Sequence, residues 1–261
     1  MIIALASLNQ EWENKAKNLQ NSELLFQKAK NYEASMIIFP EMTLTGFSMN
    51  TERTAELFEN STTIESFKSL AKRYSMGVLF GVVIAREVKA SNCAVFIDNE
   101  GNLIAQYEKI HPFSFAGEQK YFSSGNSLLT FKFRDLEIGV TICYDLRFPE
   151  IYSVLGRTSD LIVNIANWPS KRIDHWDTLL KARAIENQVF IAGINRIGRD
   201  PNGNEYVKCS KIINPHGSAL DSIISEDELD VFEVDKAEIA KLKNQFSTTQ
   251  DRKSMFYRSI L

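Results

Sequence analysis

The sequence GVTICYDLRFPE occupies residues 139–150 and joins an apolar run to a polar turn. The apolar run predicts a buried strand over 136–143, and Pro149 stands in the first turn of a short helix expected over 148–155. Cys143 therefore lies where a strand turns into a helix, which is the arrangement of a nucleophile elbow. We expect its thiol to be exposed at the end of the sheet, near a helix N-terminus that favours the thiolate.

Short apolar runs and helical patterns alternate along the rest of the chain. Strands are expected over 2–7, 36–39, 77–85, 92–97, 102–108, 128–133, 161–166, 189–195, 208–214 and 229–234, and helices over 13–33, 62–74, 171–187 and 236–243. No linker, internal repeat or low-complexity tract interrupts the pattern. We therefore expect a single domain over residues 1–261, of the α/β class, with a mixed sheet or two packed sheets.

Composition excludes several classes of function. The chain carries 30 Lys and Arg against 33 Asp and Glu, and a net charge of −3 provides no electrostatic footprint for nucleic acid. The longest apolar runs, such as Gly77–Ala85, are too short to span a bilayer, so no membrane partner is expected. Cys93, Cys143 and Cys209 lie far apart, and the three histidines lack the spacing of a metal site. We therefore expect a cytoplasmic protein without disulfides or a bound metal.

Two further segments place polar side chains at expected strand ends, where α/β proteins usually build their sites. Glu41 follows the apolar run that ends at Pro40, a position that suits a general base. Lys109 and His111 follow the strand expected over 102–108. A cysteine thiol is only a few per cent thiolate at neutral pH and needs a partner base. Glu41 or His111 could serve Cys143, and the spacing does not choose between them.

Several motifs occur in a fixed order along the chain. They are Phe39-Pro40-Glu41, Lys109-Ile110-His111, the elbow sequence 143–150, ANWP (166–169) and ARAIENQ (182–188). Taken singly, the first three also fit a surface glutamate, a solvated lysine and a core cysteine. Together, with these spacings, they resemble the nitrilase superfamily of carbon–nitrogen hydrolases. The resemblance covers nearly the whole chain. It implies an α-β-β-α sandwich that forms a homodimer through the helices next to the cysteine.

The resemblance also implies roles for individual residues. The hallmark of the superfamily is a Glu-Lys-Cys triad, so Glu41 would be the general base, Lys109 the oxyanion stabiliser and Cys143 the nucleophile. Members often carry a second glutamate after the lysine motif, and Glu118 resembles it. The resemblance implies no cofactor.

Within the superfamily the pattern is most similar to the omega-amidase branch, through PEMTLTGF (40–47) and ANWP (166–169). That branch hydrolyses the terminal amide of 2-oxo dicarboxylic acid monoamides, such as 2-oxoglutaramate and 2-oxosuccinamate. The resemblance sets Arg147 against the distal carboxylate of such a substrate, which a guanidinium binds through two parallel hydrogen bonds. The other expected substrate-binding residues are Phe47, Tyr144, Asn167 and Trp168.

Other functions remain open at this level. Another amidase of the superfamily, acting on deaminated glutathione or an N-carbamoyl compound, would share the triad and differ in the pocket. A non-catalytic binding module on the same fold is disfavoured, because a scaffold has no need of an intact triad. Arg147 has a structural alternative in which it pairs with Asp145 or Glu150, and Phe47 and Trp168 also fit core aromatics.

Overall fold

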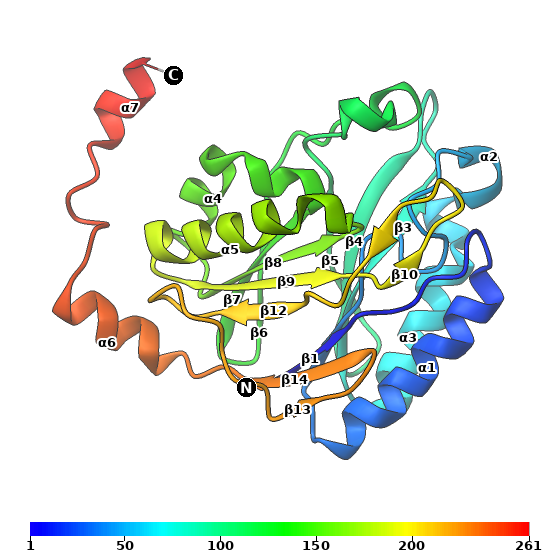
Figure 1. The fold of residues 1–261 in the computed structure, drawn as a ribbon, viewed down its shortest axis with the longest axis horizontal. Helices are drawn as coiled ribbons and strands as arrows, with labels where there is room; N and C mark the ends of the chain where they lie inside the picture. Colours follow the sequence, from blue (N-terminus) through cyan, green and yellow to red (C-terminus); the bar gives the residue numbers. More distant parts are fainter. Residues whose placement is uncertain (261) are drawn as a thin grey trace.

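Two β-sheets form the centre of the protein in its computed structural model, which describes residues 1–260 (Figure 1). Within these residues the larger sheet has seven strands in the order β13-β14-β1-β2-β3-β4-β5. Its strands are β1 (Ile2–Ala6), β2 (Met36–Ile38), β3 (Gly77–Ile84), β4 (Ser91–Ile97), β5 (Leu103–Glu108), β13 (Ile224–Ser225) and β14 (Leu229–Glu233). β1, β2 and β3 are parallel neighbours, and β3, β4 and β5 form an antiparallel meander.

The smaller sheet has five strands among the described residues, in the order β12-β9-β8-β7-β6. Its strands are β6 (Thr130–Phe133), β7 (Leu136–Ile142), β8 (Leu161–Ala166), β9 (Phe190–Asn195) and β12 (Lys211–Ile213). β7, β8 and β9 are parallel and form the centre of this sheet. A separate hairpin joins β10 (Gly198–Arg199) to β11 (Glu205–Tyr206).

The side chains of each strand alternate between two apolar cores, as the pleat of a β-strand requires. In β1, Ile3 and Leu5 face the other sheet, whereas Ala4 and Ala6 pack under helices. The core between the sheets joins residues of β1, β2 and β4 to residues of β7, β8 and β9. Because both faces of these strands are buried, their sequences read as continuous apolar runs.

Helices cover the outer face of each sheet (Figure 1). α1 (Lys15–Asn31) and α3 (Thr62–Tyr74) pack on the larger sheet, and α4 (Pro149–Leu155) and α5 (Ile173–Asn187) pack on the smaller one. The expected α-β-β-α sandwich is therefore confirmed. The short helix α2 (Thr51–Thr54) follows the loop after β2, and α6 (Ala237–Gln245) and α7 (Ser254–Ile260) extend away from the sandwich. No helix within residues 1–260 is long and apolar enough to cross a bilayer.

The strand directions bring four chain segments to one edge of the sandwich. β2 and β5 run the same way in the larger sheet, because β4 is antiparallel to both β3 and β5. β7 and β8 are parallel in the smaller sheet. The segments that follow these four strands hold Glu41, Lys109, Cys143 and Asn167. A hydrogen bond between the two sheets joins Glu41 to Asn167, and a second one joins Glu41 to Lys109 on the side of the larger sheet.

The expected elements are present, with ends shifted by at most three residues. The helix expected over 171–187 begins at Ile173, because residues Ser170–Arg172 form a separate 3₁₀ turn, η5. The expected strand over 208–214 contracts to Lys211–Ile213. The short elements β10, β11, β13, α2 and α7 were not predicted from the sequence. None of these elements is longer than seven residues.

Candidate active site

Glu41 follows β2 and is fully buried. Its Oε1 accepts hydrogen bonds from Lys109 Nζ at 2.8 Å and from Asn92 Nδ2 at 2.7 Å. Its Oε2 accepts the backbone N–H of Asn167 at 3.0 Å. A carboxylate removed from water needs such donors, and these three fix its orientation.

The backbone around Glu41 is held by a tight turn against the neighbouring strand. Gln10 Nε2 donates to the carbonyl oxygens of Glu41, Met42 and Thr43 at 3.0, 3.1 and 3.2 Å. Met42 adopts a left-handed conformation with φ of 46°. A Cβ atom at Gly81 of β3 would lie 2.2 Å from the backbone nitrogen of Met42, so no other residue fits there without displacing this turn.

Lys109 follows β5, and its ammonium lies between two buried carboxylates. Nζ is 2.8 Å from Glu41 Oε1 and 2.9 Å from Glu118 Oε2, and the lysine is 1% exposed. Burial acts to lower the pKa of Lys109, but the negative charges of Glu118 and Glu41 outweigh it and hold the pKa above its ordinary value. Lys109 is therefore a permanent cation, and the ring of Phe47 lies 5.3 Å from Nζ.

Asn92 is a member of this cluster that the sequence analysis missed. Its Nδ2 donates to Glu41 Oε1 at 2.7 Å and to Glu118 Oε1 at 2.9 Å. Its backbone carbonyl accepts the backbone N–H of Lys109 at 2.9 Å. The one available signal was a polar residue at the start of the otherwise apolar strand expected over 92–97. Asn92 joins the two carboxylates that surround the ammonium.

Cys143 follows β7 and begins the 3₁₀ helix η4 (Cys143–Arg147). Its φ of 47° is left-handed, which is the sharp turn expected of an elbow. Its Sγ lies 3.9 Å from the carbonyl oxygen of Asn167. Burial, followed by the negative charge of Glu41, raises the pKa of the thiol well above its ordinary value, and Lys109 only partly opposes this. The expected preference for the thiolate is therefore not met in this structure.

His111, the alternative base, belongs to a different contact. Its Nδ1 is 2.8 Å from Asp145 Oδ1, its backbone N–H donates to the same oxygen at 3.0 Å, and its ring stacks on Phe148 at 3.6 Å. Asp145 Oδ2 accepts hydrogen bonds from Tyr107 and from the backbone of the elbow. His111 and Asp145 thus join the lysine loop to the elbow, and Glu41 is the base whose charge reaches Cys143.

Arg147 forms no ion pair with an acidic side chain of residues 1–260. The expected structural pairing with Asp145 or Glu150 is not made, since Asp145 is engaged elsewhere. The Arg147 guanidinium lies 4.9 Å from the ring of Trp168. It also donates to His175 Nδ1 at 3.1 Å, which leaves that histidine nitrogen as an acceptor.

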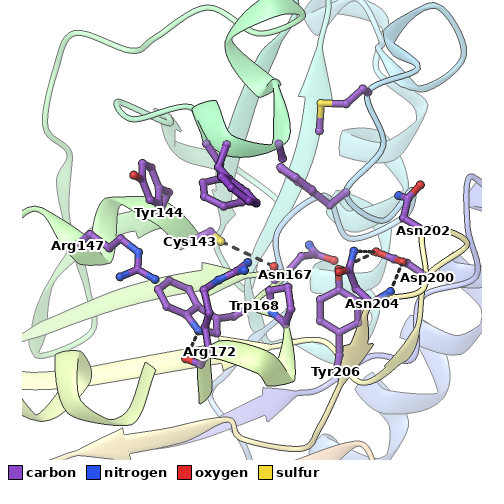
Figure 2. A pocket seen from close by; sticks show the side chains of 16 residues that line it. Cys143, Tyr144, Arg147, Asn167, Trp168, Arg172, Asp200, Asn202, Asn204 and Tyr206 are labelled. Atoms are coloured by element: carbon purple, nitrogen blue, oxygen red, sulfur yellow. Dashed lines mark hydrogen bonds between the residues drawn. The ribbon is translucent and has the colours of Figure 1, made fainter. Parts of the chain in front are cut away.

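A cavity of about 360 Å³ opens at Cys143 (Figure 2). Its walls include the five residues expected to bind substrate, Phe47, Tyr144, Arg147, Asn167 and Trp168. They also include residues that the sequence analysis did not select: Met49, Phe113, Phe115, Ala116, Pro169, Arg172, Asp200, Asn202, Asn204 and Tyr206. Glu41, Lys109 and Glu118 are almost completely enclosed, each at most 1% exposed. No group of His, Cys, Asp and Glu within residues 1–260 is arranged to hold a metal ion.

Asn167 contacts both the base and the nucleophile. Its Nδ2 donates to the backbone carbonyl of Glu41 at 2.7 Å, and its backbone N–H donates to the Glu41 carboxylate. Its backbone carbonyl accepts from Cys143 Sγ. Its Oδ1 is buried and has no hydrogen-bond partner in the part of the chain that the structure describes. Asn167 therefore positions Glu41 and leaves one acceptor unused at the wall of the cavity.

Comparison with known proteins gives a consistent result. The family model described as carbon–nitrogen hydrolase matches residues 2–244. The chain is 34% identical over 206 residues to "Omega-amidase YafV" of Yersinia enterocolitica, which covers 79% of this chain and 78% of that protein. It is 31% identical over 246 residues to "2-oxoglutaramate amidase" of Bacillus subtilis, which covers 93% of each chain.

Solved structures agree with the sequence relatives. A crystal structure of XC1258 from Xanthomonas campestris, described as a CN-hydrolase superfamily protein with an arsenic adduct in the active site, is similar with a TM-score of 0.90. Its sequence is 28% identical, and the match covers 97% of both chains. The family match over nearly the whole length, the relatives above 30% identity and the shared sandwich lead to one conclusion. The chain belongs to the carbon–nitrogen hydrolase family and is an enzyme that hydrolyses amide bonds.

Proposed function

We propose that the enzyme hydrolyses the terminal amide of 2-oxo dicarboxylic acid monoamides, such as 2-oxoglutaramate and 2-oxosuccinamate, to the acid and ammonia. The names of the two similar proteins, omega-amidase and 2-oxoglutaramate amidase, support this substrate class. The observation that carries the proposal is Arg147, a guanidinium that lines the same cavity as Cys143 and has no acidic partner among the described residues. A substrate carboxylate leaves water without large cost only where a cation receives it.

The first half of the reaction makes a thioester. Sγ of Cys143 attacks the amide carbon while Glu41 takes the thiol proton, because the raised pKa of the thiol keeps it protonated at rest. The amide oxygen becomes an oxyanion, which the Lys109 ammonium and the backbone N–H of Tyr144 stabilise. Glu41 then passes its proton to the leaving nitrogen. The carbon–nitrogen bond breaks, ammonia departs and an acyl group remains on Cys143.

The second half of the reaction releases the acid. Water attacks the thioester carbon as Glu41 takes one of its protons, and the same donors hold the second oxyanion. The carbon–sulfur bond breaks, and the sulfur recovers the proton from Glu41. The sum is amide plus water to acid plus ammonia, with the enzyme returned to its starting state.

The remaining site residues support these steps without exchanging protons. Glu118 holds the Lys109 ammonium and does not itself line the cavity, so it is a positioning residue. The unpartnered Oδ1 of Asn167 is an acceptor for an N–H of the substrate amide. Phe47 and Trp168 provide apolar walls for the carbon chain between the amide and the distal carboxylate.

The test measures ammonia release from a panel of 2-oxoglutaramate, 2-oxosuccinamate, glutamine, an N-carbamoyl amino acid, deaminated glutathione and a simple nitrile. We expect the two 2-oxo monoamides to have the highest kcat/KM. Mass spectrometry of a quenched reaction should find the acyl group on Cys143, and Cys143→Ala should be inactive. A higher kcat/KM for deaminated glutathione or the N-carbamoyl compound would replace the proposed substrate class, and full activity of Cys143→Ala would refute the thioester.

We also infer a cytoplasmic homodimer. Cys93, Cys143 and Cys209 are free thiols, which supports a reducing compartment. Val154 of α4 is 50% exposed and Ile185 of α5 is 53% exposed on the outer helical layer of the cysteine-side sheet. Apolar side chains on that layer support pairing with a second copy of the chain. Light scattering should give twice the mass of the chain, and Val154→Lys should reduce it to the mass of one chain.

A further inference from the structure

Arg172 lines the same cavity as Cys143 and Arg147, and Figure 2 shows both arginine side chains extending into it. Arg172 ends the 3₁₀ turn η5 (Ser170–Arg172), which follows Trp168 and Pro169. Its backbone is fixed at both polar groups: its N–H donates to the Pro169 carbonyl at 3.0 Å, and its carbonyl accepts Trp168 Nε1 at 2.8 Å. The side chain is only partly exposed and lines the cavity, so its charge faces the cavity.

The guanidinium of Arg172 has no hydrogen bond or ion pair with any residue that the structure describes. It lies over the ring of Phe113, 5.4 Å from the ring centre. Arg147 likewise lacks an acidic partner within residues 1–260 and donates only to the neutral nitrogen of His175. Two positive charges therefore face one cavity of about 360 Å³, and neither forms an ion pair with a described wall residue.

Asp200, the acidic residue among the described walls, is committed to its own loop. One carboxylate oxygen accepts the backbone N–H of Asn204 at 2.9 Å. The other accepts Asn204 Nδ2 at 2.9 Å and the hydroxyl of Tyr206 at 2.8 Å. Both oxygens are held within the β10–β11 hairpin, and Asp200 forms no ion pair with either arginine within residues 1–260, so the two guanidinium groups are left for a ligand.

The two cations match one chemical group better than others. A guanidinium presents two parallel N–H donors, which a single carboxylate satisfies. A second guanidinium in the same cavity needs a further acceptor on the same end of the ligand. A 2-oxo acid provides three neighbouring oxygens, two on the carboxylate and one on the adjacent carbon. A plain carboxylic acid lacks the third oxygen, and a neutral amide lacks all three.

We propose that Arg172 is a second specificity-determining residue, which together with Arg147 binds the carboxylate and 2-oxo group at the substrate end opposite the scissile amide. This inference rests on the proposed function and sharpens it, because it explains why the oxo group is selected as well as the charge. A guanidinium that binds the carboxylate and 2-oxo oxygen of the substrate raises kcat/KM for that substrate. It does not raise kcat/KM for analogues that lack these oxygens.

The experiment compares three amides that differ by one feature each. They are 2-oxoglutaramate, glutaramate without the oxo oxygen, and pentanamide without the oxo oxygen and the carboxylate. We expect Arg172→Met to lower kcat/KM for 2-oxoglutaramate at least about tenfold, for glutaramate about threefold and for pentanamide less than about twofold. Arg172→Lys, which keeps the charge and loses the planar fork, should fall between Arg172→Met and wild type.

Lys171→Met is the matched control. Lys171 is the neighbouring cation in η5, is exposed and does not line the cavity, so the control removes the same charge from the same turn. It should leave all three values of kcat/KM unchanged. Equal losses for Arg172→Met on the three amides, or no loss on 2-oxoglutaramate, would overturn the inference.

A binding measurement separates this inference from the proposed function. Calorimetry with the Cys143→Ala protein should detect 2-oxoglutarate, and adding Arg172→Met should weaken it at least about tenfold and weaken glutarate less. If wild type fails to hydrolyse 2-oxoglutaramate, the proposed function fails while calorimetry still decides the role of Arg172. If wild type hydrolyses it and Arg172→Met changes neither rate nor binding, only the inference about Arg172 fails. Failure of the Cys143→Ala protein to bind 2-oxoglutarate also overturns it.

Discussion

Replacing Lys109 by methionine removes an ammonium that neutralises two buried carboxylates and keeps a side chain of similar length. Nζ lies 2.8 Å from Glu41 and 2.9 Å from Glu118, and none of the three side chains is more than 1% exposed. Breaking a buried pair costs about 3–5 kcal/mol, because the remaining charge has neither water nor a partner. At about 2–4 °C per kcal/mol for a chain of this size, we expect the melting temperature to fall by roughly 6–20 °C near neutral and alkaline pH.

The size of the loss should follow the charge of Lys109. Burial acts to lower the pKa of Lys109, but the charges of Glu118 and Glu41 hold it above its ordinary value. The stability that the ammonium supplies is therefore fully present below the ordinary lysine pKa of about 10.4 and declines only as pH rises beyond it. The loss in Lys109→Met should be equally large at neutral and mildly alkaline pH.

Calorimetric melting at about pH 7 and pH 9 checks this, with Lys28→Met as the control. Lys28 pairs with Glu226 at 2.9 Å on the surface, where both side chains are at least 34% exposed. Such a pair contributes at most about 1 kcal/mol, so the control should shift little at either pH. A Lys109→Met loss that is as small as that of the control, or that disappears at about pH 9, would refute the argument. Where the variant is folded, kcat should fall by about 10²–10³ with a smaller change in KM.

Three further predictions follow from the site. Arg147→Met should lower kcat/KM for 2-oxoglutaramate at least about tenfold and barely affect a neutral amide of similar length; equal losses would make Arg147 a support of the elbow. Iodoacetamide should alkylate Cys143 slowly at neutral pH and faster as pH rises, because burial and Glu41 raise the pKa of the thiol; a rate already maximal near pH 7 would contradict this. Gly81→Ala should destabilise the protein by at least about 2 kcal/mol, since its Cβ would lie 2.2 Å from a backbone nitrogen; an unchanged melting temperature would count against the tight turn.

The sandwich could be predicted from the sequence because its signals are local. The strands that become β2, β7 and β8 are short apolar runs that end at polar or proline-containing segments, and Glu41, Cys143 and Asn167 follow those ends. The elbow at Cys143 could be predicted for the same reason. What the sequence does not show is that folding desolvates the thiol and brings it near the charge of Glu41, which together raise its pKa.

Other parts of the site depend on pairings between distant segments. Asn92 reaches the two carboxylates because β4 pairs Cys93 with Glu108, which sets Asn92 beside Lys109. That register depends on how the whole sheet pairs, and it cannot be predicted from the sequence of either strand alone. Arg172 was expected within a helix over 171–187, where its direction would have been set by the helix, whereas the 3₁₀ turn after Pro169 aims it into the cavity.

The site is divided between the two sheets, and this has a consequence for how activity arises during folding. Glu41 and Lys109 follow strands of the larger sheet, while Cys143 and Asn167 follow strands of the smaller one. A folding intermediate with only one sheet formed would hold either a base without its thiol or a thiol without its base. Such a species has no hydrolytic power towards other amides in the cell. Activity therefore requires that the two sheets have packed against each other. The rate at which activity returns on refolding should report the rate of that packing.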